Sequence, residues 1–192
     1  DKEGKWLYPE EVEKKGDKTF IKKSDKSVIT LGPPESMSKS KKNTIDPEIM
    51  IEKFGADAVR WFILSDSPPE KDIQWTDAGV ISANKFLQKI WNINFIISKK
   101  KAEQSDISIN EEFVSKINLY IDKIDSSINE FKFNVCIAQF YEIYNLLKSF
   151  IEKKVDNKIL KENIIKIMKL MIPFVPHLAY ECLELHQCQD TQ

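Results

Sequence analysis

Hydrophobic residues recur at helical spacing through most of the second half of this chain. Two stripes follow the spacing: Val80, Ala83, Leu87, Ile90, Asn94 and Ile97 form the first, and Phe113, Ile117, Tyr120, Ile124, Ile128 and Phe131 form the second. Residues three and four apart lie on one face of an α-helix. The pattern therefore predicts two long amphipathic helices.

Two further helices are expected after these. One covers about 134–153 and would be capped by Asn134. It would be lined by Ala138, Tyr141 and the run from Tyr144 to Leu147. The last covers about 157–185 and must break or kink at Pro173 and Pro176, because proline has no amide donor. Four helices with short connectors predict an antiparallel four-helix bundle.

The first half of the chain has a different pattern. Short β-prone runs, "KWLY", "TFIKK" and "SVITL", alternate with turn signals between residues 5 and 31. They predict short strands or a hairpin. Asp46 followed by Pro47 then marks a helix start, with a helix expected over 47–54 and a stop at Gly55. A second short helix should cover 56–64, before an irregular connector, "SDSPPEKDIQW".

These elements predict a mainly α fold. A small strand and loop segment, 1–32, precedes a lysine-rich loop with connecting helices, 33–76. The α-helical bundle follows over 77–185, and 186–192 form a polar tail.

Composition narrows the class of protein. The chain has 192 residues, 42% of them hydrophobic, and a formal net charge of -1, so any attraction to nucleic acid must come from local patches. Its three cysteines are too few for a disulfide framework, and we expect no disulfide and a cytoplasmic location. The apolar runs are too short to span a bilayer. Because no methionine opens it, the chain looks like a piece of a longer polypeptide.

The segment "GPPESMSKSKKNTIDPE" (32–48) carries the main candidate chemistry. It places three ammonium groups and three hydroxyls just before the Asp-Pro helix start, and both kinds of group suit phosphate oxygens. A solvated lysine turn is the alternative interpretation, and composition alone favours it. The order of the residues favours a phosphate-binding loop.

That order resembles a known family. Met37-Ser38-Lys39-Ser40-Lys41-Lys42-Asn43, followed by "IDP" and "FGADAVRWF", resembles the KMSKS signature loop of class I aminoacyl-tRNA synthetases. The flanking runs "KWLYPEEVEKKG" and "SDSPPEKDIQWTDAGVISANKFLQKIW" are similar to the leucyl-tRNA synthetase branch, with the valine, isoleucine and methionine branches as rivals. The likeness is continuous over about residues 5–91 and returns at "MIPFVPHLAYECLE".

The resemblance implies roles for the loop residues. In the family, this loop stabilises the ATP phosphates while the amino acid carboxylate attacks, so Lys39 is expected to be catalytic. Ser36, Met37, Ser38, Lys39 and Ser40 would form the ATP phosphate loop, with Lys41 and Lys42 as further candidates. Ser36 stands where the family has its first lysine. We hypothesise that Lys41 or Lys42 partly replaces that charge, in which case Ser36→Lys should leave ATP affinity nearly unchanged.

The same resemblance implies what these residues lack. The family's histidine-containing motif has no counterpart, since the histidines here are His177 and His186. The segment would form the edge of a catalytic domain and its tRNA-facing bundle, and alone it is not expected to charge tRNA. We expect a monomer that uses ATP with Mg²⁺, with leucine and tRNA(Leu) as the other partners of the whole enzyme. The rival from another class is a non-catalytic RNA-binding or scaffold bundle.

Several other residues are weaker candidates. Arg60, the sole arginine, suits a forked ion pair. Asp57 and Asp66 are more often caps or solvated charges than catalysts. Three tryptophans could stack on bases, but their context favours packing: Trp61, Trp75 and Trp91.

A last pair of features concerns the C-terminal half. His177, Cys182, His186 and Cys188 are zinc-type ligands, but without paired spacing, so we expect no metal site. Residues 134–172 carry seven lysines against four acids, an excess that could face a phosphate backbone through shape and backbone contacts.

Overall fold

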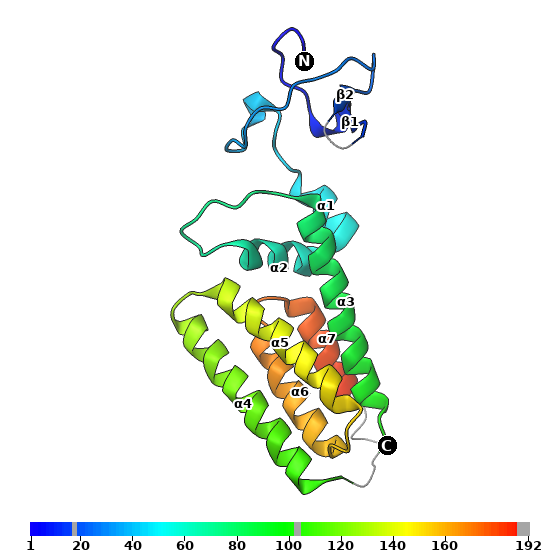
Figure 1. Cartoon of the computed structure of the whole chain (residues 1–192), viewed down its shortest axis with the longest axis vertical. Coiled ribbons are helices and arrows are strands. Elements are labelled where there is room, and N and C mark those ends of the chain that lie inside the picture. Colours follow the sequence, from blue (N-terminus) through cyan, green and yellow to red (C-terminus); the bar gives the residue numbers. More distant parts are fainter. Residues whose placement is uncertain (17–18, 102–104, 188–192) are drawn as a thin grey trace. The chain divides into compact units, whose positions relative to one another are not determined.

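Figure 1 shows the computed structural model of the chain, which describes residues 1–16, 19–101 and 105–187. In chain order, its elements are a 3₁₀-helix (Pro9–Glu11), β1 (Val12–Lys14), β2 (Phe20–Lys22), a second 3₁₀-helix (Lys39–Lys41), α1 (Pro47–Phe54), α2 (Ala56–Asp66), α3 (Asp77–Lys99), α4 (Ile107–Asn129), α5 (Phe133–Ile151), α6 (Asn157–Met171) and α7 (Pro176–Gln187). The predicted mainly α fold with a small strand segment is confirmed.

The chain divides into two compact units, Asp1–Met50 and Ile51–Gln192. The first contains the two-stranded antiparallel sheet, in which Glu13 pairs with Ile21, and an isolated bridge joins Ile21 to Val28. A hairpin within residues 5–31 is confirmed, but of the three predicted runs only "TFIKK" supplies a strand (β2), and β1 lies outside all of them. "SVITL" contributes only the bridge at Val28, and "KWLY" forms no strand. Tyr8 instead precedes the 3₁₀-helix, whose N-terminus is closed by the Glu11 carboxylate accepting from the Tyr8 N–H at 2.8 Å.

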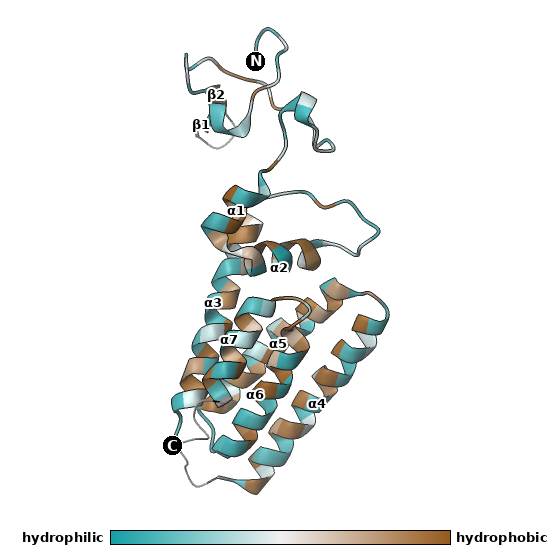
Figure 2. Ribbon diagram, turned by 180° about the vertical axis from the view of Figure 1, so that it is seen from behind, coloured by the Kyte–Doolittle hydropathy of each residue, from teal (hydrophilic) through white to brown (hydrophobic). Residues whose placement is uncertain are grey.

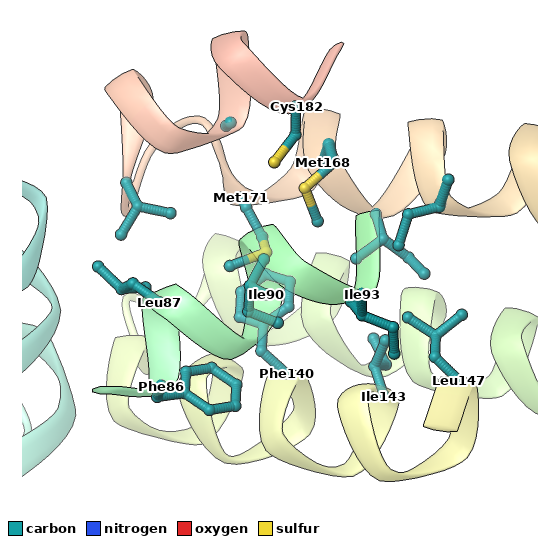
Figure 3. Packing of buried hydrophobic residues seen from close by; sticks show 14 of the residues in the cluster. Phe86, Leu87, Ile90, Ile93, Phe140, Ile143, Leu147, Met168, Met171 and Cys182 are labelled. Atoms are coloured by element: carbon teal, nitrogen blue, oxygen red, sulfur yellow. The ribbon is translucent and has the colours of Figure 1, made fainter. Parts of the chain in front are cut away.

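The second unit is a helical assembly with one apolar core. α4 packs on α5 and α6, and α3 packs on α5, α6 and α7. Figure 2 shows hydrophobic and hydrophilic residues alternating along these helices. Their inner faces meet in Figure 3, where residues of four helices interdigitate: Phe86, Leu87, Ile90 and Ile93 of α3, Phe140, Ile143 and Leu147 of α5, Met168 and Met171 of α6, and Cys182 of α7.

The predicted stripes have different outcomes. All six residues of the α3 stripe are buried. In the α4 stripe, Phe131 was wrongly placed, because the helix ends at Asn129 and Phe131 adopts a left-handed conformation (φ 56°) with 67% of its surface exposed. The predicted α5 face is confirmed at Leu147, which is buried, and at Tyr144 and Leu146, which pack against the core, but it is wrong at its N-terminal end. Ala138 is exposed and Tyr141 half-exposed, and the buried residues are Cys136, Ile137, Phe140, Ile143, Leu147 and Phe150.

The sequence predicted some of the helix ends correctly and others wrongly. The Asp46 carboxylate accepts from the Glu48 N–H at 2.9 Å at the start of α1, and Gly55 (φ 82°) ends α1 and begins α2. The proposed Asn134 cap is wrong, since α5 begins at Phe133 without a side-chain cap. The expected break at the prolines separates α6 from α7, which replace the single last helix of the sequence prediction.

Candidate phosphate-binding loop

The serine and lysine loop has a defined backbone within the Asp1–Met50 unit. Ser38 is extended (φ −151°, ψ 138°), residues 39–41 make one 3₁₀ turn, and Lys42 is left-handed (φ 53°). The Lys41 N–H donates to Ser38 O at 3.1 Å and the Lys42 N–H donates to Lys39 O at 3.2 Å. The turn thus projects the side chains of successive residues in different directions.

Asn43 fastens the two sides of the loop together. Its Oδ1 accepts from the Ser38 N–H at 2.7 Å, and its Nδ2 donates to Ser36 O at 3.3 Å. The hydroxyls of Ser38 and Ser40 lie 2.7 Å apart and share a hydrogen bond. Sequence reasoning gave Asn43 no role, although an asparagine at the end of a turn is a common source of such side-chain bonds to the backbone.

The three lysines of the loop have different surroundings. The Lys41 ammonium pairs with the Glu35 carboxylate. The Lys42 ammonium lies 4.7 Å from the centre of the Tyr8 ring, a cation–π contact. The Lys39 side chain is exposed, and within the described parts of the chain no carboxylate or ring contacts its ammonium. Lys39 therefore offers its full charge to a ligand.

The other motif positions are open to solvent. Ser36 is exposed, and so is Met37, with 49% of its surface accessible. Because Glu35 already neutralises Lys41, the hypothesis that Lys41 replaces the missing charge at Ser36 loses support. Lys42 is the better candidate, since a ring contact leaves its charge uncompensated.

Part of the loop also lines a cavity of about 520 Å³ within the same unit. Its wall is formed by the apolar side chains Trp6, Leu7, Phe20 and Leu31, and by loop residues 41–43. Trp6 is 49% exposed. The cavity gives the loop an apolar neighbour on one side, while Lys39 is not among the residues that line it.

The predicted ion pair of Arg60 is absent among the described residues, and the guanidinium has another use. Arg60 Nη2 donates to Pro173 O at 2.6 Å and Nε donates to Phe174 O at 3.2 Å. These carbonyls follow α6, where proline ends the helix and leaves acceptors without helical partners. The forked geometry was expected correctly, but its target is the backbone.

Asp57 caps a helix, which the sequence analysis favoured over a catalytic role, but the helix is distant in the sequence. The residue is 8% exposed, and its carboxylate accepts from the Leu178 N–H at 2.7 Å, in the first turn of α7. The other oxygen lies 2.9 Å from His177 Nδ1. Asp66 is exposed and bonds the Ser67 hydroxyl at 3.3 Å. Thus α2 holds both sides of the proline break, with Arg60 on the α6 side and Asp57 on the α7 side.

The tryptophans divide between packing and exposure. Trp61 is fully buried, and its indole Nε1–H donates to the Tyr141 hydroxyl at 3.3 Å. Trp75 meets the Phe62 ring edge-on at 5.3 Å. Trp91 is 40% exposed on α3, so the packing interpretation fails for this residue.

The zinc-type residues of the C-terminal half form no metal site in the described part of the chain, which contains no group of three or more metal-binding side chains. Burial raises the pKa of the Cys182 thiol to about 12 and also raises the pKa of Cys136. Both thiols therefore stay protonated at neutral pH. His186 is buried against Asn94, with Nε2 3.0 Å from Oδ1, and Cys188 lies outside the described residues.

Two sequence families match this chain. Residues 14–76 match the family described as tRNA synthetases class I (I, L, M and V), and residues 110–191 match the anticodon-binding domain of tRNA ligase. The chain is 38% identical over 185 residues to the leucine–tRNA ligase of Orientia tsutsugamushi (strain Boryong), covering 96% of this chain and 22% of that protein. It is 40% identical over 182 residues to the leucine–tRNA ligase of Rickettsia massiliae (strain Mtu5), covering 94% and 22% respectively.

The chain is similar, over nearly its whole length, to one segment of the leucyl-tRNA synthetase family.

A solved structure of this family agrees in fold. The ternary complex of Agrobacterium radiobacter K84 agnB2 LeuRS with tRNA and LeuAMS superimposes with a TM-score of 0.68 and 26% sequence identity, over 80% of this chain and 20% of that one. The chain spans about a fifth of the length of the leucyl-tRNA synthetases that it matches. The first family match contains the loop, α1 and α2, and the second begins within α4, so α3 lies between them. In the described part of the chain, no helix is long and apolar enough to cross a membrane.

Proposed function

We propose that this chain supplies the ATP phosphate-binding loop and a tRNA-facing helical bundle of a leucine–tRNA ligase. The whole protein would activate leucine as leucyl-adenylate and transfer it to tRNA(Leu). The observation that carries the proposal is the loop of residues 36–43, in which Lys39 alone among the three lysines is exposed and without a partner in the described residues. The loop lies inside the segment that matches the class I synthetases.

The chemistry assigned to Lys39 is electrostatic. A leucine carboxylate oxygen attacks the α-phosphorus of ATP, the bond from this phosphorus to the bridging oxygen breaks, and pyrophosphate leaves. Negative charge increases on the departing oxygens during this step. An ammonium placed there stabilises the transition state, and removing one such donor typically costs about 3 kcal/mol, or roughly a hundredfold in rate. The Ser38 and Ser40 hydroxyls would donate to the same phosphates.

Mg²⁺ does not fit the loop residues themselves. The loop offers ammonium and hydroxyl groups, and its Glu35 carboxylate is paired with Lys41. Mg²⁺ prefers carboxylate, phosphate and water oxygens. The ion would therefore be held by the nucleotide and by groups other than those of this loop.

The bundle is proposed to contact tRNA. Residues 110–191 match an anticodon-binding domain, and the similar solved structure is a complex with tRNA. An antiparallel arrangement of the bundle helices, a monomeric state and a cytoplasmic location remain part of the proposal. Discrimination among small apolar amino acids is hard to achieve by binding alone, so an editing site elsewhere in the whole enzyme is expected.

The test is exchange of labelled pyrophosphate into ATP by the complete polypeptide that carries this sequence, with each of the twenty amino acids. Exchange with leucine alone is expected, and Lys39→Ala should lower its rate about a hundredfold. Lys23→Ala, an exposed lysine of the same unit outside the loop, is the matched control and should have little effect. Exchange with another amino acid would overturn the leucine branch.

A nucleotide-binding readout separates the enzyme from the scaffold alternative. ATP should protect residues 36–43 from limited proteolysis if the loop binds phosphates. Absence of both exchange and protection would favour the non-catalytic RNA-binding or scaffold bundle.

A further inference from the structure

Glu35 comes immediately before the serine and lysine loop, and its side chain is already paired. The carboxylate contacts the ammonium of Lys41, six residues further along the chain. The two side chains are 32% and 39% exposed, respectively, so both are partly sheltered from solvent. The motif that resembles the family begins one residue later and therefore assigns no role to Glu35.

The 3₁₀ turn at residues 39–41 directs its two lysines differently. Such a turn has about three residues per revolution, so successive side chains are about 120° apart. Lys39 and Lys41 therefore leave the turn in different directions. Lys41 meets Glu35, whereas Lys39 is exposed.

Two hydrogen bonds of Asn43 keep the Glu35 end of the loop beside this turn. Asn43 Oδ1 accepts from the Ser38 N–H at 2.7 Å, and Asn43 Nδ2 donates to Ser36 O at 3.3 Å. Because Ser36 adjoins Glu35, these bonds hold the carboxylate within reach of Lys41. The hydrogen bonds of the loop itself therefore favour the ion pair.

A phosphate that binds at this loop competes with Glu35 for one ammonium. A carboxylate and a phosphate are both anions, and placing both against the same positive charge brings two negative charges together. The Lys41 ammonium must therefore lose its carboxylate before a phosphate takes that place. Glu35 thus stands where it controls whether Lys41 takes part in binding.

We propose that Glu35 is a positioning residue, which holds Lys41 in the empty loop and releases it to the phosphates of the nucleotide. The inference rests on the proposed function, because the anion is taken to be the triphosphate of ATP. Exchange of a carboxylate for a phosphate keeps the ammonium paired before and after binding, at the cost of some ATP affinity. Ligation of Mg²⁺ by Glu35 fits less well, because the ammonium against this carboxylate repels a divalent cation.

The experiment measures the KM for ATP and the kcat of pyrophosphate exchange by the complete polypeptide that carries this sequence, at saturating leucine. Glu35→Gln keeps the shape of the side chain and removes its charge. It should lower the KM for ATP about two- to fivefold, a modest change because partly exposed ion pairs are weak. The kcat should change less than about twofold, since Lys41 is already released from residue 35 once ATP is bound.

Two further variants test whether Glu35 acts through Lys41. In a Lys41→Ala background, the effect of Glu35→Gln on the KM should be smaller than in the wild type. An equal or larger effect would show that Glu35 acts on the nucleotide directly, and would overturn the proposal. Glu13→Gln is the matched control, because it breaks the ion pair with Lys26 in the same unit, outside the loop. It should leave the KM within about 1.5-fold of the wild type.

The remaining outcomes separate this role from the proposed function. Exchange with leucine combined with an unchanged or raised KM in Glu35→Gln would reject the role of Glu35 and leave the proposed function intact. A raised KM that more Mg²⁺ restores would assign the carboxylate to the metal ion instead.

If the complete polypeptide shows no exchange, binding of inorganic triphosphate to this 192-residue chain decides, as measured by isothermal titration calorimetry. Tighter binding by Glu35→Gln than by the wild type would support the role of Glu35 while the ligase function fails. Equal affinities, or no binding by either chain, would overturn both.

Discussion

Asp57→Ala should destabilise the helical unit by about 2–3 kcal/mol. The change removes the acceptor of the Leu178 N–H, which lies 2.7 Å from the carboxylate in the first turn of α7. A hydrogen bond to a charged group contributes about 1.5–3 kcal/mol, and a negative charge at a helix N-terminus adds about 0.3–1 kcal/mol. The second contact, to His177, contributes little because that side chain is 76% exposed.

The assay is urea unfolding of the 192-residue chain, followed by circular dichroism at 222 nm. The helical unit contains nearly all of the helical residues, so the signal reports on it. Asp57→Asn keeps an acceptor oxygen but loses the charge, and it should cost about 1 kcal/mol. Asp66→Ala, an exposed carboxylate of the same helix, is the control and should lie within about 0.5 kcal/mol of the wild type. If Asp57→Ala proves no more destabilising than Asp66→Ala, the capping role is wrong.

Three further outcomes are expected. Gly79→Ala should lower the free energy of unfolding in urea by about 1–2 kcal/mol, because the added Cβ would clash with the Phe62 ring. An unchanged urea midpoint would show that the ring moves aside without cost. Phe131→Gly should raise the free energy of unfolding by about 0.5–1 kcal/mol, because glycine adopts the left-handed conformation after the end of α4 without strain. A lower free energy of unfolding would show that the lost ring contact between Phe131 and Phe133 outweighs this gain. Cys182 should resist alkylation at pH 8.5 in the native chain and react in urea, as followed by peptide mass mapping. Its native pKa of about 12 exceeds the ordinary thiol pKa of 9.0, so the folded state holds the proton to a higher pH. Stability should therefore fall between about pH 9 and 12, less steeply in Cys182→Ala.

Periodicity predicted the buried face of α3 correctly. The six residues of the α3 stripe are all buried. The phase of α5 was harder, because apolar and aromatic residues surround most of that helix. Tyr141 is left half-exposed, where its hydroxyl accepts from the buried Trp61 indole. The position of a tyrosine depends on the hydrogen-bond partner of its hydroxyl as well as on the packing of its ring. The spacing of apolar residues along the sequence contains no information about that partner.

Contacts between distant segments could not be predicted from local sequence. The roles of Asp57 and Arg60 depend on carbonyls and amides more than a hundred residues away. The sequence signal was the sole arginine, which correctly suggested a forked contact but not its target. β1 was missed for another reason: three residues with one apolar side chain give no measurable alternation, and backbone pairing with β2 defines the strand.

The loop could be predicted from the sequence in part, and the rest depends on contacts with distant residues. The resemblance of its residue order to the family motif singled out Lys39, whereas composition alone treats Lys39, Lys41 and Lys42 as equivalent cations. The structure distinguishes them through partners, since Glu35 pairs with Lys41 and Tyr8 lies beneath Lys42. Tyr8 is far upstream and carries no motif, so its contact was invisible in the sequence. Because a paired ammonium must lose its partner before it binds phosphate, Lys41 is the least available of the three cations. The proposed role of Lys39 thus draws on what its neighbours already contact, as well as on its place in the motif.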